Sequence, residues 1–219
     1  GYPGSGYGKY QTGVGGEFTL KPLTGWLNLS GYVAGETKDI GVAGTFQTFC
    51  VEGSEYIYPY PTIYNAVLNT KAIWGSMRAQ GGDPISVGTG WLYSQFATGS
   101  WDAGYGLSYN YADKLGARRS TSADLLQKAI WWLEDEEGIT YSASNPYMKA
   151  AATKFGSQAG AKADGGWNYG VYALNLNTLG GGLAQDQLVY THIPDGGLTL
   201  MLLGLGLGGV GMVSRKLRK

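Results

Sequence analysis

The chain has few of the residues on which most catalytic sites depend. Among its 219 residues there is one cysteine, Cys50, and one histidine, His192. A single cysteine excludes an intrachain disulfide. A single histidine beside the C-terminal tail leaves a Ser-His-Asp hydrolase, or a histidine-based metal site, without the residue that it needs in the body. We therefore expect no enzymatic turnover, no cofactor and no bound metal.

Charge is also scarce and balanced. Charged residues make up 15% of the chain, and 16 Lys and Arg face 16 Asp and Glu. The chain thus lacks the excess of basic residues that nucleic-acid binding requires. What the chain has in quantity is glycine (38), tyrosine (17) and tryptophan (7), a profile typical of loop-rich, β-rich extracellular domains. We expect a flexible Gly/Tyr-rich arm over residues 1–16, one domain over 17–192 and a tail over 193–219.

Hydrophobic periodicity divides the body into strands and helices. Alternating segments predict strands over residues 17–20, 26–33, 45–52, 169–176 and 188–192. Helical spacing predicts helices over residues 63–77, 120–137 and 145–155. Residues 91–96 fit a helix or a strand. Strands at both ends with helices between them predict a β-rich α+β fold, a β-sandwich or barrel with a helical insertion, followed by a C-terminal hydrophobic helix.

The tail has three parts. It opens with the turn motif Ile193, Pro194, Asp195, Gly196 and Gly197, and it ends with the basic residues Arg215, Lys216, Arg218 and Lys219. Between them runs an uncharged segment that includes Leu198, Leu202, Leu205 and Val213. At about 1.5 Å per residue this segment makes a helix slightly shorter than the roughly 30 Å hydrocarbon core. Basic residues beside a membrane helix stay on the cytoplasmic side, so we expect the body outside.

This tail resembles the exosortase-targeted surface proteins of Gram-negative bacteria, whose PEP-CTERM or VPDSG-CTERM signals combine a Pro-containing motif, a Leu/Gly-rich helix and a basic end. The preceding residues 185–189, Gln-Asp-Gln-Leu-Val, resemble the lead-in of such signals. The resemblance implies export to the cell surface, at least transient membrane anchoring through the tail, and processing by an exosortase-type enzyme.

A second resemblance rests on Cys50. The run Phe49-Cys50-Val51-Glu52 on a predicted strand and the run Leu126-Gln127-Lys128-Ala129-Ile130-Trp131 on a predicted helix resemble two motifs of the thioester domains of bacterial surface adhesins. Leu126 stands where that family has Thr. The resemblance implies a thioester between Cys50 and Gln127, which a target amine opens to form an amide. Considered without the resemblance, Cys50 is a small buried hydrophobe and Gln127 a solvated helix residue.

Other side chains suggest weaker sites. The acids of residues 134–137 could bind calcium but fit a solvated face better, and Glu52 and Glu55 offer carboxylates for glycoside hydrolysis without a fixed separation. Several aromatic residues could stack on sugars or fill the core, namely Trp91, Tyr93, Trp101, Tyr105 and Tyr109. We expect an adhesive or structural surface protein that binds itself, surface amines or glycans, and that assembles into a filament or matrix. The alternative is a carbohydrate-binding module of an exopolysaccharide layer.

Overall fold

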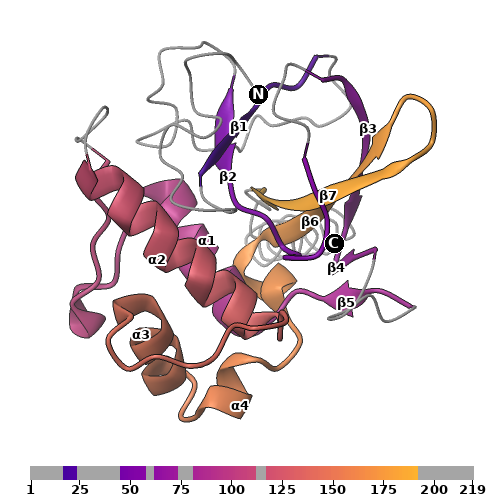
Figure 1. Ribbon diagram of the computed structural model, residues 1–219. Coiled ribbons are helices and arrows are strands. Elements are labelled where there is room, and N and C mark those ends of the chain that lie inside the picture. Colours follow the sequence, from indigo (N-terminus) through magenta and orange to yellow (C-terminus); the bar gives the residue numbers. More distant parts are fainter. Residues whose placement is uncertain (1–16, 24–44, 58–61, 74–80, 112–116, 192–219) are drawn as a thin grey trace, which may run out of the picture.

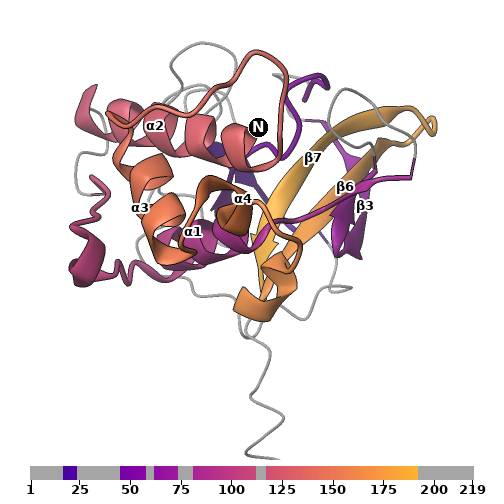
Figure 2. The ribbon, with the colours of Figure 1, turned by 90° about the horizontal axis from the view of Figure 1, so that it is seen from below.

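Helices and strands occupy separate sides of the molecule. The structure, a computed structural model, describes residues 17–23, 45–57, 62–73, 81–111 and 117–191. The strands are β1 (Phe18–Leu20), β2 (Phe46–Thr48), β3 (Tyr64–Asn69), β4 (Lys71–Ala72), β5 (Asp83–Pro84), β6 (Val171–Thr178) and β7 (Leu183–Tyr190). The helices are α1 (Val87–Thr98), α2 (Ala117–Leu133), α3 (Pro146–Lys154) and α4 (Gln158–Ala161), with the 3-10 turns η4 (Ala103–Tyr105) and η5 (Gly166–Tyr169). Figures 1 and 2 show the helices gathered on one side and β3, β6 and β7 on the other.

In the described part of the chain, all strand pairs are antiparallel. β1 pairs with β2, β4 pairs with β5, and β3, β6 and β7 form a sheet in the order β3-β6-β7. The chain that leaves β2 then joins β7, because Val51 N donates to Asp186 O at 3.0 Å and Leu188 N donates to Phe49 O at 3.1 Å. The two larger sheets are therefore continuous through this short pairing, in the order β1-β2-β7-β6-β3.

The predicted mixture of strands and helices is confirmed. The closed-barrel alternative is wrong for the described residues, because their sheets are open and β1 and β3 are edge strands there. The predicted strand over residues 26–33 and the C-terminal hydrophobic helix lie outside the described residues. Among the helices that the structure describes, none has the length and apolar character needed to cross a membrane.

The helix predicted over residues 63–77 is wrong over its described part. This segment forms β3 and β4 instead, with Tyr64 opposite Thr178 and Leu68 opposite Leu174. The helical spacing counted Ile63 and Val67 as core residues, yet they are 55% and 57% exposed. Pairing with β6 decided the conformation, because it extends along all six residues of β3 and gives partners to the backbone groups that face β6.

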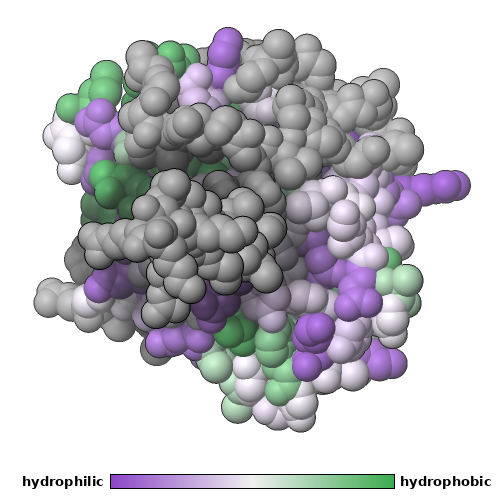
Figure 3. All heavy atoms as spheres, turned by 180° about the vertical axis from the view of Figure 1, so that it is seen from behind, coloured by the Kyte–Doolittle hydropathy of each residue, from purple (hydrophilic) through white to green (hydrophobic). Residues whose placement is uncertain are grey.

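One end of this sheet carries exposed apolar side chains. Ile63 precedes β3, Leu179 follows β6 and Leu183 begins β7, and their exposed fractions are 55%, 67% and 42%. The turn between β6 and β7 lies at the upper left of Figure 3, where apolar atoms gather at the surface. This end of the sheet is therefore the described surface best suited to an apolar contact.

Residues 91–96, which the sequence left open, belong to α1 at the centre of the helical side. Ser86 caps its N-terminus by accepting from Thr89 N, and Gly99 ends it with φ +69°. The helix is enclosed on many sides, which removes the amphipathic pattern by which helices are usually found. A Cβ on Gly88 would lie 2.5 Å from Leu133 Cδ2, so glycine here permits close packing of α1 against α2.

The two other predicted helices are confirmed with shifted ends. α2 starts at Ala117 and ends at Leu133 rather than spanning residues 120–137. Its buried face holds Leu126, Ala129, Ile130 and Leu133, as the spacing predicts. α3 begins at Pro146, and the side chain of Asn145 caps it by accepting from Tyr147 N and Met148 N.

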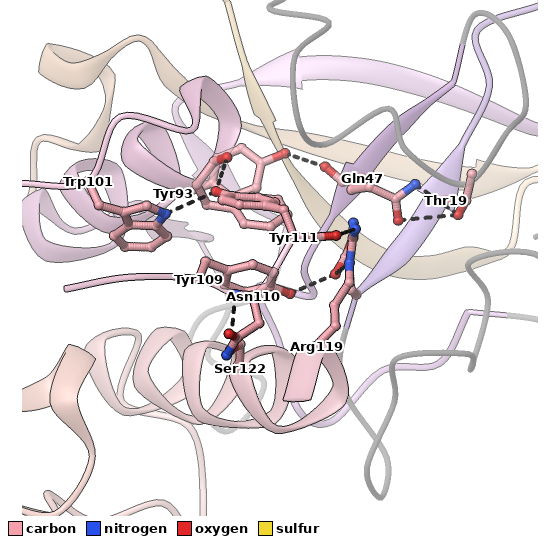
Figure 4. A network of polar contacts seen from close by, with 11 residues as sticks. Thr19, Gln47, Tyr93, Trp101, Tyr109, Asn110, Tyr111, Arg119 and Ser122 are labelled. Atoms are coloured by element: carbon pink, nitrogen blue, oxygen red, sulfur yellow. Dashed lines mark hydrogen bonds and ion pairs between the residues drawn. The ribbon is translucent and has the colours of Figure 1, made fainter. Parts of the chain in front are cut away.

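A buried ion pair fastens β1 to α2. The Arg119 and Glu17 side chains are both fully buried, and Arg119 Nη2 contacts Glu17 Oε1 while Nε donates to Oε2 at 3.0 Å. Tyr109 Oη donates to the same carboxylate at 2.6 Å, and Arg119 Nη1 donates to Tyr111 O at 2.8 Å (Figure 4). The pair and its hydrogen bonds thus join Tyr109, Tyr111 and Arg119 to Glu17, which is distant from them in sequence.

Replacing Arg119 with alanine is expected to lower the free energy of unfolding by about 3–5 kcal/mol, because it leaves the Glu17 carboxylate buried without its counter-ion. Urea unfolding followed by circular dichroism measures this. Lys128→Ala is the control on the same helix, since Lys128 is half-exposed and pairs with Asp124 four residues away, an arrangement that contributes about 0.3–0.5 kcal/mol. Equal effects of the two substitutions would contradict the importance of the buried pair.

Candidate functional site

Cys50 faces Gln187 across two antiparallel strands. The two residues form a bridge, and the hydrogen bonds on either side of it run from Leu188 N to Phe49 O and from Val51 N to Asp186 O. Cys50 and Gln187 are therefore a non-hydrogen-bonded pair, the type in which facing side chains lie closest. Gln187 Nε2 lies 3.5 Å from Cys50 Sγ. The strand predicted over residues 45–52 is shorter than expected, since β2 ends at Thr48 and Cys50 lies in a β-bridge just beyond it. The sequence does not indicate a role for Gln187.

Gln127 lies on the side of Cys50 opposite β7, and its side chain binds the main chain of Cys50. Because Cys50 is in a non-hydrogen-bonded pair, its own N–H and C=O point away from β7. Cys50 N donates to Gln127 Oε1 at 3.0 Å, and Gln127 Nε2 donates to Cys50 O at 2.8 Å. The carboxamide of Gln127 thus pairs with Cys50 as a neighbouring strand would.

The fold brings the predicted partners Cys50 and Gln127 into contact, but the carboxamide of Gln127 does not lie beside the sulfur of Cys50. Both polar atoms of the Gln127 side chain bind the Cys50 backbone, whereas the carboxamide beside Sγ belongs to Gln187. Gln187 was missed because residues 185–189 resemble the lead-in of a sorting signal. In the structure they lie inside β7. Only the register of β7 against residue 50, which the sequence does not reveal, identifies Gln187.

The site is closed to bulk solvent. The exposed fractions of Cys50, Gln127 and Gln187 are 0%, 1% and 0%. Burial raises the pKa of the Cys50 thiol far above its ordinary value, against the opposing effect of the hydrogen bond from Gln187. At neutral pH the sulfur is therefore protonated. The Oε1 atom of Gln187 is buried without a hydrogen-bond partner.

The segment after Cys50 is fixed on both sides. Gly53 N donates to Glu136 Oε2 at 2.8 Å, just beyond the end of α2. Gln185 Nε2 donates to Glu52 O at 2.6 Å, and Gln185 N donates to Tyr56 O at 3.2 Å. These contacts hold the Cys50 strand between α2 and β7 and so keep the sulfur beside Gln187.

The acids of residues 134–137 do not form one solvated face. Glu134 and Glu136 are 3% and 5% exposed, while Asp135 and Glu137 are exposed. Glu134 Oε1 accepts from Ser86 Oγ at 2.8 Å and from Ser86 N at 3.2 Å. Burial raises the pKa of Glu134 to about 7 despite these hydrogen bonds. Glu134 therefore connects α2 to the capping residue of α1.

Three carboxylates lie together near the site. One oxygen each of Glu52, Glu55 and Asp186 falls within 4.8 Å of the others, a spacing that one metal ion could bridge. The oxygens of Asp186 already accept from Ile73 N at 2.7 Å, from Asn175 Nδ2 at 2.6 Å and from Leu176 N at 3.1 Å. Burial raises the pKa of Asp186 to about 6. These bonds give Asp186 a structural role within the sheet.

Most aromatic residues considered for sugar stacking lie in the core. Tyr93, Trp91 and Tyr109 are 0%, 5% and 7% exposed. Trp101 is partly buried and stacks on Tyr109 with an angle of 4° between the rings, and its Nε1 donates to Tyr111 Oη (Figure 4). Tyr105 is partly exposed against Trp91. These five residues do not form an exposed stacking surface.

The sorting motif, the hydrophobic segment and the basic end, residues 193–219, lie outside the described residues, as do His192 and the arm over residues 1–16. Comparison of the chain with protein-family models, curated proteins and solved structures finds no match. The geometry around Cys50 therefore carries the functional argument.

The wild type is expected to lose stability as pH rises through about 7, and Glu134→Gln is expected to abolish this pH dependence. A carboxyl whose pKa is raised on folding stabilises the fold below its unfolded pKa, near 4.5, and this contribution is lost as pH rises through the folded pKa of about 7. Glutamine keeps an oxygen for Ser86 and does not ionise. At pH 8 the variant should be more stable on the order of 1–3 kcal/mol.

Thermal unfolding between pH 4.5 and 8 measures the effect. Glu137→Gln, at an exposed acid of the same segment, should keep the wild-type pH dependence. An unchanged pH dependence in the Glu134 variant would contradict the assignment.

Proposed function

We propose that this protein is an adhesive or structural surface protein that carries an internal thioester between Cys50 and Gln187 and uses it to link covalently to amines. The observation that carries the proposal is the 3.5 Å contact between Cys50 Sγ and Gln187 Nε2 in a fully buried cross-strand pair. The resemblance to thioester domains supports the same chemistry. The structure favours Gln187 over Gln127 as the acyl partner.

Bond formation requires no external reagent. Cys50 Sγ attacks Gln187 Cδ, so that a sulfur–carbon bond forms and the carbon–nitrogen bond breaks. The thiol proton passes to the departing nitrogen, which leaves as ammonia. The 3.5 Å contact joins the atom that must lose a proton to the atom that must gain one. Because the strands fix both side chains, much of the entropic cost of the encounter is met on folding.

Gln127 acts as a positioning residue in this proposal. Its two hydrogen bonds, at 3.0 and 2.8 Å, fix the backbone of Cys50 in the plane of the sheet, and its full burial excludes water from that side. A thioester hydrolyses when water reaches it, so exclusion of water preserves the bond until an amine arrives. The motif that includes Gln127 thus positions and shields the sulfur of Cys50 without reacting with it.

Capture of a target consumes the bond once. The amine nitrogen attacks the carbonyl of Gln187, the carbon–sulfur bond breaks, and the amine proton returns to Cys50 as its thiol. The product is an amide between Gln187 and the target. Such a protein forms one link per molecule, which suits attachment or matrix building better than turnover. Export, tethering through residues 193–219 and exosortase-type processing complete the proposal, and the apolar end of the sheet at Ile63, Leu179 and Leu183 offers a contact for self-assembly.

Intact mass tests the bond and its partner. The wild type should be lighter than its sequence by one ammonia, and Cys50→Ala and Gln187→Ala should each abolish this loss. Gln95→Ala is the matched control, since Gln95 is a buried glutamine on α1 whose carboxamide binds Trp91 O and Asp102 N and not the Cys50 segment; it should keep the loss. A full-mass wild type with an alkylatable thiol would reject the proposal, and loss of the bond with Gln127→Ala but not with Gln187→Ala would restore Gln127 as the partner.

Gln127→Ala should leave the chemistry available but less well positioned. The Cys50 N–H and C=O lose their buried partners, which costs about 1–3 kcal/mol for each unsatisfied group. We expect a lower midpoint of urea unfolding and a mixture of ammonia-depleted and full-mass molecules. A variant with wild-type stability and complete bond formation would show that Gln127 has no positioning role.

A further inference from the structure

Gln187 and Trp131, near Cys50, each carry a buried polar atom without a hydrogen-bond partner, and the chemistry of these two atoms is complementary. Gln187 Oε1 is an acceptor without a donor, and Trp131 Nε1 is a donor without an acceptor. The side chains are 0% and 7% exposed. A buried polar group without a hydrogen bond costs about 1–3 kcal/mol, so such groups in a folded protein call for an explanation.

The position of Trp131 relates it to the site. It lies four residues after Gln127 on α2, so both side chains lie on one face of the helix, a turn apart. Gln127 is hydrogen-bonded to Cys50, and Trp131 belongs to the same buried cluster as Cys50. A Cβ on Gly53, three residues after Cys50, would lie 3.8 Å from Trp131 Cε2, the ring carbon bonded to Nε1. The N–H edge of the indole therefore borders the Cys50 segment.

The other buried hydrophobic side chains of this cluster carry no hydrogen-bond donor apart from the Cys50 thiol. The remaining members are Phe18, Phe46, Ile57, Leu174, Leu176, Ala184 and Val189. The thioester chemistry, however, places negative charge on one atom. When sulfur or an amine attacks Gln187 Cδ, the carbonyl oxygen Oε1 becomes an oxyanion, and in an apolar cluster such a charge is costly without a donor.

We propose that Trp131 Nε1–H is the donor that stabilises the oxyanion at Gln187 Oε1, both when the thioester forms and when an amine opens it. This inference rests on the proposed thioester. Indole suits the task because its N–H donates a hydrogen bond, accepts none and does not ionise at neutral pH. Two groups that are unsatisfied in the resting protein find each other in the transition state, so the interaction accelerates the reaction instead of only stabilising the fold.

Single-turnover aminolysis tests the inference. Methylamine is small enough for a buried site, and its addition is followed by intact mass as the ammonia-depleted protein gains one methylamine. Trp131→Phe, which keeps an aromatic ring and removes the N–H, should react about 100-fold more slowly at every methylamine concentration. Trp132→Phe is the matched control: Trp132 is also buried on α2 but lies in the other core cluster, against Tyr141, and its variant should react as the wild type does.

The outcomes separate this inference from the proposed function. A wild type that never loses ammonia overturns both. A Trp131→Phe protein that forms the bond and reacts at the wild-type rate overturns only the role of Trp131. If it folds but fails to form the bond while Trp132→Phe succeeds, the inference is supported, because formation passes through the same oxyanion.

A second variant covers the case in which Trp131→Phe fails to fold. Benzothienylalanine at position 131 keeps the shape of the indole and replaces N–H with sulfur, so it should fold and react slowly, and a wild-type rate would overturn the inference. A spectroscopic readout is also expected. The indole N–H resonance of Trp131 should differ between the wild type and Cys50→Ala, whereas that of Trp132 should not.

Discussion

The structure depends on how the main chain around Cys50 is held. Its neighbours Phe49 and Val51 hydrogen-bond to β7, while its own N–H and C=O bind the carboxamide of Gln127 on α2. Residues 49–51 therefore join the β1-β2 pair to the three-stranded sheet, and Cys50 among them joins the strand side to the helical side. The same hydrogen bonds determine the orientation of the sulfur. Once they are made, the sulfur faces Gln187.

The helical side and the buried polar groups complement this arrangement. The Arg119–Glu17 pair attaches the start of α2 to β1, and Glu136 attaches the residues beyond its end to Gly53. α2 is thus fixed at both ends against the strands that flank Cys50, with Gln127 and Trp131 between the two attachments. A helix held in this way can position a carboxamide and an indole N–H precisely enough for chemistry in a site without solvent.

Features of the fold that depend on local sequence patterns could be predicted from the sequence, whereas those that depend on tertiary contacts could not. The amphipathic face of α2, the short helix at Pro146 and the extended segment around Cys50 are local patterns, and the sequence predicts them. α1 is enclosed on most sides and has no polar stripe, so its period is weak. The exposed residues Ile63 and Val67 fall at helical spacing, which predicts a helix where β3 forms, and only the pairing with β6 corrects this prediction.

The candidate site shows the same limit. Cys50 and Gln127 were found because they lie in motifs, but Gln187 owes its place to the register of β7 against residue 50, a pairing over 137 residues of sequence. Residues 134–137 show the same limit, because two of the four acids are buried and accept hydrogen bonds from Ser86 and Gly53. Neither the strand register nor the burial of these two acids is encoded in a short sequence pattern, because tertiary contacts decide both.

The central place of β7 has a mechanical consequence for a covalent surface link. A partner joined to Gln187 would pull on a strand that has β6 on one side and the Cys50 segment on the other, not on a loop at the edge of the molecule. Tension would be shared between pairings on both flanks of the strand, and unfolding would have to begin in the middle of the sheet. An attachment point of this kind resists shear without any disulfide, which matches a chain that has only one cysteine.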